Sequence, residues 1–268
     1  MKIGELFRYM KPTLHRKLIW SIGLFIVVMS GCSMNNWEVA ETQNLSIYYK
    51  KGSYADRNIE EAKRIYEYSF NVAEQYLPRI NKVPKLKVFL YEKLRNKGFS
   101  RVNDREVHYR FSEEFRLTSV HEMMHVFLYE LNPDAPLRVE EGICRIKEGK
   151  RKRFKGNDYQ IMYYQLVKLV SEERWSLNEV FQDKYKDDDE GNIAAAFIMY
   201  ATNKLGEPKF WEFYQELDKD NWAGLLKKYF GQDIPVIDQE FKAYVKTIPD
   251  PPEAFKFKFS RKTAHLHK

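Results

Sequence analysis

The pentapeptide from His121 to His125, His-Glu-Met-Met-His, constrains the fold of this chain more than any other segment. Side chains four positions apart lie on the same face of an α-helix, so both histidines reach one metal ion if the segment is helical. Glu122 then lies one step round the helix, within reach of a water molecule at that metal. Apolar residues flank the motif and Asn132-Pro133 stops it, which predicts a helix over residues 113–131.

A carboxylate that could complete a metal site follows closely in the sequence. The segment Pro136 to Gly142 reads Pro-Leu-Arg-Val-Glu-Glu-Gly, and Glu141 lies 16 positions after His125. A short loop can turn the chain back here, so that Glu141, on a helix expected over residues 137–147, faces the histidines. Two imidazoles, one carboxylate and one open position are the usual ligand set of a catalytic zinc ion. The alternative, a core helix with two ordinary histidines, stays open.

The motif helix followed by Glu-Gly resembles the gluzincin metallopeptidases, including the broad peptidase MA-like group and, more distantly, the aminopeptidase N-like enzymes. The order of the expected elements agrees with that family over residues 45–246. The resemblance implies a zincin-like fold, a Zn²⁺ ion held by His121, His125 and Glu141, and a peptide or protein substrate. It also implies that Glu122 is the general base, which takes a proton from a zinc-bound water and passes it to the leaving amine.

The donor that stabilises the oxyanion is less clearly marked in the sequence. Many relatives carry a tyrosine near the start of a late, alanine-rich helix, where it donates a hydrogen bond to the oxyanion. Tyr185 is the nearest match at that place and is therefore the candidate catalytic residue beside Glu122. Tyr200, Asn192 and His108 remain as alternatives.

The residues around Glu-Gly depart from the family pattern, which often has an alanine and an aromatic residue after the glycine. Here Ile143, Cys144, Arg145 and Ile146 follow. Cys144 could fill the niche of the alanine, or it could act as a fourth zinc ligand, which would close the site and remove catalysis. Glu140, or another nearby carboxylate, is expected to orient a histidine ligand through its second ring nitrogen.

The rest of the sequence predicts an α+β fold, with a small N-terminal sheet and a helix followed by a mainly helical C-terminal part. Apolar and aromatic runs predict strands at 45–49, 86–91 and 102–111. One apolar face at helical spacing predicts a helix at 58–77. Further helices are expected at 137–147, 157–172, 176–183, 191–204, 207–217, 221–230 and 235–246.

The start of the chain has the pattern of an export signal. Residues 1–31 hold five basic residues and one acid, and the apolar run from Leu18 to Met29 has 12 residues. That run is shorter than the roughly 20 residues that a membrane-spanning helix needs. Ser-Gly before Cys32 resembles the lipobox of bacterial lipoproteins, which implies that Cys32 carries a lipid anchor.

These features predict four segments along the chain: a lipoprotein signal peptide at 1–31, a tether at 32–44, a metallopeptidase domain at 45–248 and a loose tail at 249–268. Without the signal, 40 basic and 37 acidic residues remain, so the net charge falls from +7 to +3. This mixed charge and the expected export exclude nucleic acid as a partner. The expected location is the extracytoplasmic face of the cell membrane, at the outer surface or in the periplasm.

The sequence thus favours an exported, lipid-anchored zinc metallopeptidase. Two alternatives stay open: a non-catalytic zinc-binding or surface interaction lipoprotein derived from the gluzincin fold, and a helical surface module in which the motif is merely part of the core. The substrate sequence, endo- or exopeptidase action and the oligomeric state are left open.

Overall fold

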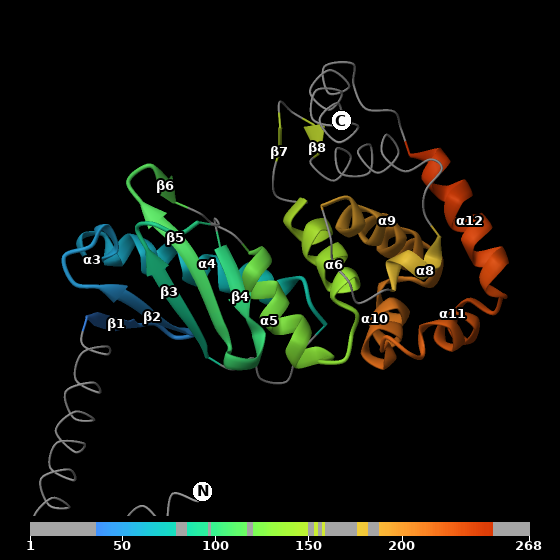
Figure 1. Ribbon diagram of the computed structural model, residues 1–268, viewed down its shortest axis with the longest axis horizontal. Coiled ribbons are helices and arrows are strands. Elements are labelled where there is room, and N and C mark those ends of the chain that lie inside the picture. Colours follow the sequence, from blue (N-terminus) through green and yellow to red (C-terminus); the bar gives the residue numbers. More distant parts are fainter. Residues whose placement is uncertain are drawn as a thin grey trace, which may run out of the picture.

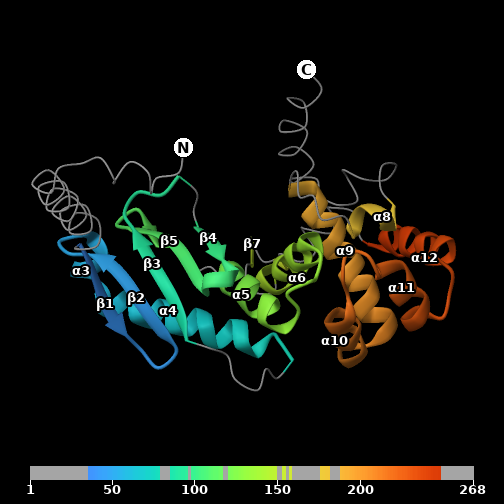
Figure 2. The same ribbon diagram turned by 60° about the horizontal axis from the view of Figure 1, so that its bottom comes forward.

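Figure 1 and Figure 2 show a computed structural model, which describes residues 36–78, 85–95, 98–116, 120–149, 153–154, 157–158, 176–181 and 188–248. Cys32, Tyr185, the expected signal at 1–31 and the expected tail at 249–268 lie outside these residues. Most of the helix expected at 157–172 also lies outside them. Among the residues that the structure describes, no helix is both long enough and apolar enough to cross a membrane.

The first half of the described chain forms a mixed sheet with the strand order β1-β2-β3-β5-β4, and β6 pairs with β5. Strands β2, β3 and β5 run parallel, whereas β1 and β4 are antiparallel to their neighbours at the two edges. The elements of this half are β1 (Trp37–Glu41), β2 (Leu45–Lys50), α3 (Tyr54–Arg57), α4 (Ile59–Gln75), β3 (Leu86–Tyr91), β4 (Gly98–Arg101), a 3-10 turn (Val102–Asp104), β5 (Glu106–Ser112) and β6 (Phe115–Arg116).

Apolar residues at every second position of the strands give the sheet one buried face. In β3, Leu86, Val88 and Leu90 are buried, and the residues between them are half-buried. Helices α3 and α4 cover the buried face, and Figure 2 shows α4 running beneath the strands. Tyr66 of α4 stacks on Tyr109 of β5, with ring centroids 5.0 Å apart. Helix α4 also packs against the motif helix, so the buried side of the sheet, α4 and the motif helix share one core.

Several predictions for this half are corrected by the structure. The sequence predicts a tether at 32–44, but residues 37–41 form β1 at the edge of the sheet. The helix predicted at 113–131 begins only at His121, because residues 113–114 form a turn and residues 115–116 form β6. The strand predicted at 102–111 begins with a 3-10 turn. The short edge strand β4 has no counterpart in the prediction.

The second half is mainly helical, as the sequence predicts, which confirms the α+β class. Strands β7 (Arg153–Phe154) and β8 (Asn157–Asp158) form a small separate pair. The helices predicted at 137–147, 191–204, 207–217, 221–230 and 235–246 agree with the observed ones to within a few residues at each end. The helix predicted at 157–172 is wrong at its start, because Asn157 and Asp158 form β8, and the helix predicted at 176–183 is described only over 176–181. The helices are α5 (His121–Leu131), α6 (Leu137–Gly149), α8 (Leu177–Val180), α9 (Asp188–Leu205), α10 (Glu207–Glu216), α11 (Trp222–Phe230) and α12 (Ile234–Thr247).

Helices α6 and α9 pack closely, and a glycine makes that possible. A Cβ atom built on Gly142 would lie 2.7 Å from the backbone of both Ala194 and Ala195. Real Cβ atoms do not approach backbone so closely, so this crossing requires glycine at position 142 and small residues opposite it. Figure 1 shows α6 between α5, which packs toward the sheet, and α9, in the centre of the helical half. Residues on α6 therefore stand at the junction of the two halves.

Candidate metal centre

Helix α5 places two imidazole rings side by side at its start. His121 and His125 are one turn apart, and their Nε2 atoms lie 3.2 Å from each other. His125 is buried and His121 is half-buried. The six residues Met123–Leu128 are all buried, since α5 packs between α4 and α6. The two rings therefore project from a helix whose position is fixed by the core on several sides.

Helix α6 brings Glu141 to the same point. Its Oε2 atom lies 3.4 Å from Nε2 of His121, and its Oε1 atom lies 3.3 Å from Nε2 of His125. The short connection after α5 turns the chain back, and the Asn132 side chain anchors that turn by donating to the backbone carbonyl oxygens of Tyr214 and Leu217, each at 2.6 Å. The geometry that the sequence predicts for the three candidate ligands is therefore present.

The donor set and its spacing fit zinc. All three potential ligand atoms lie within 4.8 Å of one another. With zinc–ligand bonds of about 2.0–2.1 Å, the ligand atoms of a tetrahedral site are separated by about 3.3–3.4 Å. The two Nε2 atoms, 3.2 Å apart, are near this separation, and each of them lies 3.3–3.4 Å from a different oxygen of Glu141. Two imidazole nitrogens and one carboxylate are also the borderline-soft donors that zinc prefers.

A second carboxylate supports the ring of His125 from behind. Oε2 of Glu140 lies 3.5 Å from Nδ1 of His125, while Nε2 of the same ring faces Glu141. Burial opposes the charged form of His125, but contacts with Cys144, Glu140 and Glu141 outweigh it and raise the pKa of His125 well above its usual value. Burial also opposes the charged form of Glu141, yet hydrogen bonds from His121 and His125 hold its pKa well below the usual range.

Cys144 lies beside the site but is not one of the three grouped residues. It is fully buried, and burial raises the pKa of its thiol to about 11 although His125 acts in the opposite direction. Its burial and its position outside the three grouped residues favour the small-residue niche for Cys144 over the fourth-ligand interpretation.

Arg145, for which the sequence indicated no role, connects the third candidate ligand to α9. The Nε atom of Arg145 lies 3.6 Å from Oε2 of Glu141, and its Nη1 atom donates to Oδ1 of Asn192 at 2.8 Å. Both Arg145 and Asn192 are buried. Gly191 makes room for the guanidinium, because a Cβ there would lie 2.6 Å from Nε of Arg145. Arg145 thus contacts both Glu141 of the candidate metal centre and Asn192 of α9.

Of the residues predicted to act as general base or oxyanion donor, only Glu122 lies on the motif helix. Glu122 is half-buried in the first turn of α5, next to His121. Tyr200 donates to Oε2 of Glu240 at 2.8 Å and belongs to an aromatic cluster between α9 and α12. His108 is buried in β5 between aromatic rings, on the open face of the sheet. Asn192 is bonded to Arg145, and the role predicted for Tyr185 stays untested.

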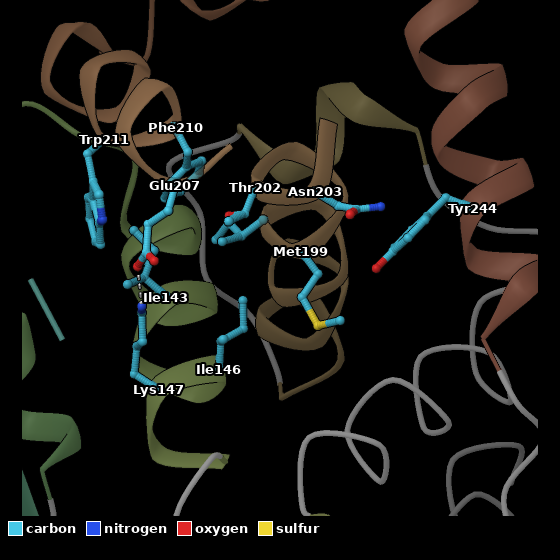
Figure 3. Close-up of a pocket in the computed structure, with 11 residues that line it drawn as sticks. Ile143, Ile146, Lys147, Met199, Thr202, Asn203, Glu207, Phe210, Trp211 and Tyr244 are labelled. Carbon is cyan, nitrogen blue, oxygen red and sulfur yellow. Dashed lines mark hydrogen bonds and ion pairs between the residues drawn. The ribbon is translucent and has the colours of Figure 1, made fainter. Parts of the chain in front are cut away.

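A cavity of about 480 Å³ lies between α6, α9, α10 and α12. Figure 3 shows Lys147 of α6 in its wall, with its ammonium group 3.0 Å from Oε1 of Glu207. Ile143 and Lys147 line this cavity, whereas Glu141 and Arg145 of the same helix belong to the candidate metal centre. None of the three candidate ligands lines the cavity, so the two sites are separate.

No protein-family model and no curated protein matches the chain. Among solved structures, a mutant of the M1 zinc metallopeptidase from Deinococcus radiodurans is similar, with a TM-score of 0.50 and 14% identity over 81% of this chain. The M1 zinc metallopeptidase from the same organism gives a TM-score of 0.49 at 14% identity over 81% of this chain. This chain covers 53% of each of those chains, so it spans about half of their length.

At this identity the likeness shows the fold alone. The chain has the zincin-like α+β architecture of that metallopeptidase, with a sheet followed by a mainly helical part, and the predicted fold class is confirmed. His121, His125 and Glu141 form a possible metal-binding group within this fold.

Proposed function

We propose that this protein is a zinc-dependent peptidase. The observation that carries the proposal is the convergence of His121, His125 and Glu141, from two helices, with their potential ligand atoms within 4.8 Å of one another. A metallopeptidase fold supports the assignment. The half-buried Glu122 beside His121 supplies the group that hydrolysis requires and that a purely structural metal site does not need.

The residues of the chain then have distinct tasks. A bound zinc ion supplies Lewis acidity toward a carbonyl group and lowers the pKa of water. The carboxylate of Glu122 accepts the proton of the attacking water and returns it to the nitrogen of the leaving amine. Glu140 orients the ring of His125 through Nδ1, and Arg145 holds the carboxylate of Glu141. The oxyanion donor is proposed to be Tyr185.

The sheet offers a means to hold a peptide substrate. Strand β4 lies at the edge of the sheet next to β5, and it also packs against α5. Within the described residues, no strand pairs with its outer edge, so its main-chain groups are available to an extended chain. A peptide that adds to this edge is held by main-chain hydrogen bonds next to the motif helix.

The lipid anchor belongs to the same proposal. We propose that Cys32 is lipidated and that the protein acts on the extracytoplasmic face of the cell membrane. The support is the sequence of the first 32 residues, with its cationic start, short apolar run and Ser-Gly-Cys end. Mass spectrometry of the N-terminal peptide tests this directly. A diacylated Cys32 is expected, and an unmodified Cys32 in a membrane-extracted protein would overturn it.

The enzyme proposal is tested by comparing wild type with Glu122→Gln on a broad peptide library. We expect wild type to hold one zinc ion per chain and to lose cleavage when zinc is chelated. Glu122→Gln should keep zinc while cleavage falls by about 10²–10⁴-fold, the usual contribution of a general base. Glu130→Gln, which removes a half-buried carboxylate that pairs with Arg105 at the other end of the same helix, is the matched control and should cleave like wild type.

Two results would count against this assignment. A protein without stoichiometric zinc would remove the metal centre and leave the motif as part of the core. A zinc protein in which wild type and Glu122→Gln are equally inactive would be a non-catalytic zinc-binding lipoprotein instead.

A further inference from the structure

The face of the sheet opposite α4 carries a continuous row of stacked rings. Tyr48, Phe89, His108 and Phe99 come from β2, β3, β5 and β4, and successive ring centroids lie 4.6, 4.8 and 4.3 Å apart. Trp37 of β1 meets this row edge to face, with its centroid 5.6 Å from that of Phe89. The row therefore crosses the five strands from β1 to β4, and its tyrosine, phenylalanine and tryptophan rings are only half-buried.

No described helix packs on this face, since α3, α4 and α5 lie on the other side of the sheet. Val39 of β1 is 46% exposed here and pairs with Tyr48. A single exposed valine on a protein surface is ordinary. A valine next to a row of partly exposed aromatic rings forms a continuous apolar patch, and such patches mark sites where another surface binds.

Charged side chains surround the row and are mostly cationic. The cations in or next to the strands on this face outnumber the carboxylates five to two; they are Lys50, Lys85, Lys87, Arg101 and Arg110, and the carboxylates are Glu41 and Glu106. Lys50 lies over the ring of Trp37, with its Nζ atom 5.8 Å from the centroid. Tryptophan and tyrosine favour the membrane–water interface, and lysine and arginine near it are attracted to anionic lipid headgroups.

The start of the chain indicates what covers this face. Trp37 is the first residue of β1, and Cys32 precedes it by five positions. Five extended residues span at most about 18 Å, so a lipid on Cys32 would hold Trp37 within that distance of the bilayer. We infer that this aromatic face lies against an anionic lipid bilayer. The inference rests on the proposed lipid anchor and adds the orientation in which the domain is held.

The test uses the full-length, lipidated protein in vesicles of phosphatidylcholine with or without phosphatidylglycerol. An environment-sensitive fluorophore is attached to Val39→Cys on the aromatic face. The matched control is Tyr68→Cys on α4, where the side chain is 62% exposed on the other side of the sheet. Cys144 is buried and the lipid blocks Cys32, so the parent protein should take up no label. If Val39→Cys fails to fold, Ser46→Cys labels the same face.

The inferred orientation predicts a blue-shifted emission at position 39 and protection from a water-soluble quencher, both stronger with phosphatidylglycerol. Position 68 should stay accessible to the quencher in either vesicle. Equal accessibility at the two positions in a protein whose Cys32 is diacylated would overturn the orientation and leave the anchor intact. An unmodified Cys32 would instead remove the anchor. Protection at position 39 already present in detergent would assign the face to another protein surface and overturn the inference.

Discussion

Glu140 and Glu141 are consecutive residues, yet they contact opposite nitrogens of one imidazole ring. Oε2 of Glu140 lies 3.5 Å from Nδ1 of His125, and Oε1 of Glu141 lies 3.3 Å from Nε2. The first carboxylate is placed to orient the ring, and the second lies on the side of the ring that faces the candidate metal position. Substituting Glu140 and Glu141 one at a time should therefore have different effects on zinc binding.

Glu140→Gln should weaken zinc binding without abolishing it. Loss of an outer carboxylate from a histidine ligand typically lowers metal affinity by about 10–100-fold. Competition with a fluorescent chelator measures the dissociation constant. Glu141→Gln, which removes a proposed ligand itself, should lose more affinity than Glu140→Gln. An unchanged affinity in Glu140→Gln would show that the contact with His125 is incidental.

Gly142→Ala should lower the thermal midpoint. The added methyl group would lie 2.7 Å from backbone atoms of α9, and overpacking of this kind costs about 1–3 kcal/mol. Gly224→Ala on α11 is the matched control, because nothing lies within 4 Å of a Cβ at that position. That control should be neutral or more stable by up to about 1 kcal/mol, as alanine favours a helix over glycine. Equal midpoints for the two variants would contradict the close crossing.

Asn192→Ala should destabilise the protein, because it removes an acceptor from the buried guanidinium of Arg145. A buried polar group that loses its partner costs about 1–3 kcal/mol. In a double-mutant cycle with Arg145→Met, the two losses should be non-additive by about 0.5–3 kcal/mol. Additive losses in chemical denaturation would show that the two side chains act independently.

Glu240 should contribute a pH-dependent part of the stability. Hydrogen bonds from Lys204, Gln232 and Tyr200 lower the pKa of Glu240 to about 2. The pKa of a glutamate in an unfolded chain is about 4.3. The ionised carboxylate of Glu240 therefore contributes its full stabilisation above about pH 4.3 and loses it as the pH falls toward 2. Glu240→Gln should therefore be less stable than wild type at pH 7, by on the order of 1 kcal/mol.

Thermal unfolding across the acid range measures the difference between wild type and Glu240→Gln. The difference should shrink steadily as the pH falls from about 4.3 to about 2. Glu212→Gln on the exposed side of α10 is the control and should follow wild type at every pH. A stability difference between wild type and Glu240→Gln that stays constant with pH would mean that the charge of Glu240 does not contribute to stability.

The geometry of the candidate site could be predicted because it depends on the helix period and on a helix-stop signal, both of which are visible in the sequence. The positions of His121 and His125 on one helical face are set by the helix period, and Asn132-Pro133 marks where the chain turns. Glu141 needs only a short loop to return to the histidines. The roles of these residues, and those of Glu122 and Tyr185, remain predictions.

The features that sequence analysis missed depend on contacts between distant parts of the chain. Arg145 and Asn192 are 47 positions apart, and only the crossing of α6 and α9 brings them together. Strand β1 has a mixed, polar pattern because it lies at an edge of the sheet, so it resembles a tether in the sequence. Residues 113–116 form a turn and the short strand β6, but no glycine or proline stands between Glu113 and His121 to mark a break in the sequence before the motif helix.

The proposed zinc ligands also have a mechanical consequence. His121 and His125 belong to a helix that packs toward the sheet, and Glu141 belongs to a helix that packs on α9. An ion that joins them would fasten the two halves of the molecule across the loop between α5 and α6. Because such an ion binds only the docked arrangement, an excess of about 100-fold over its dissociation constant would add about 2.7 kcal/mol to it. The concentration of free zinc would then set how firmly the two halves are held together.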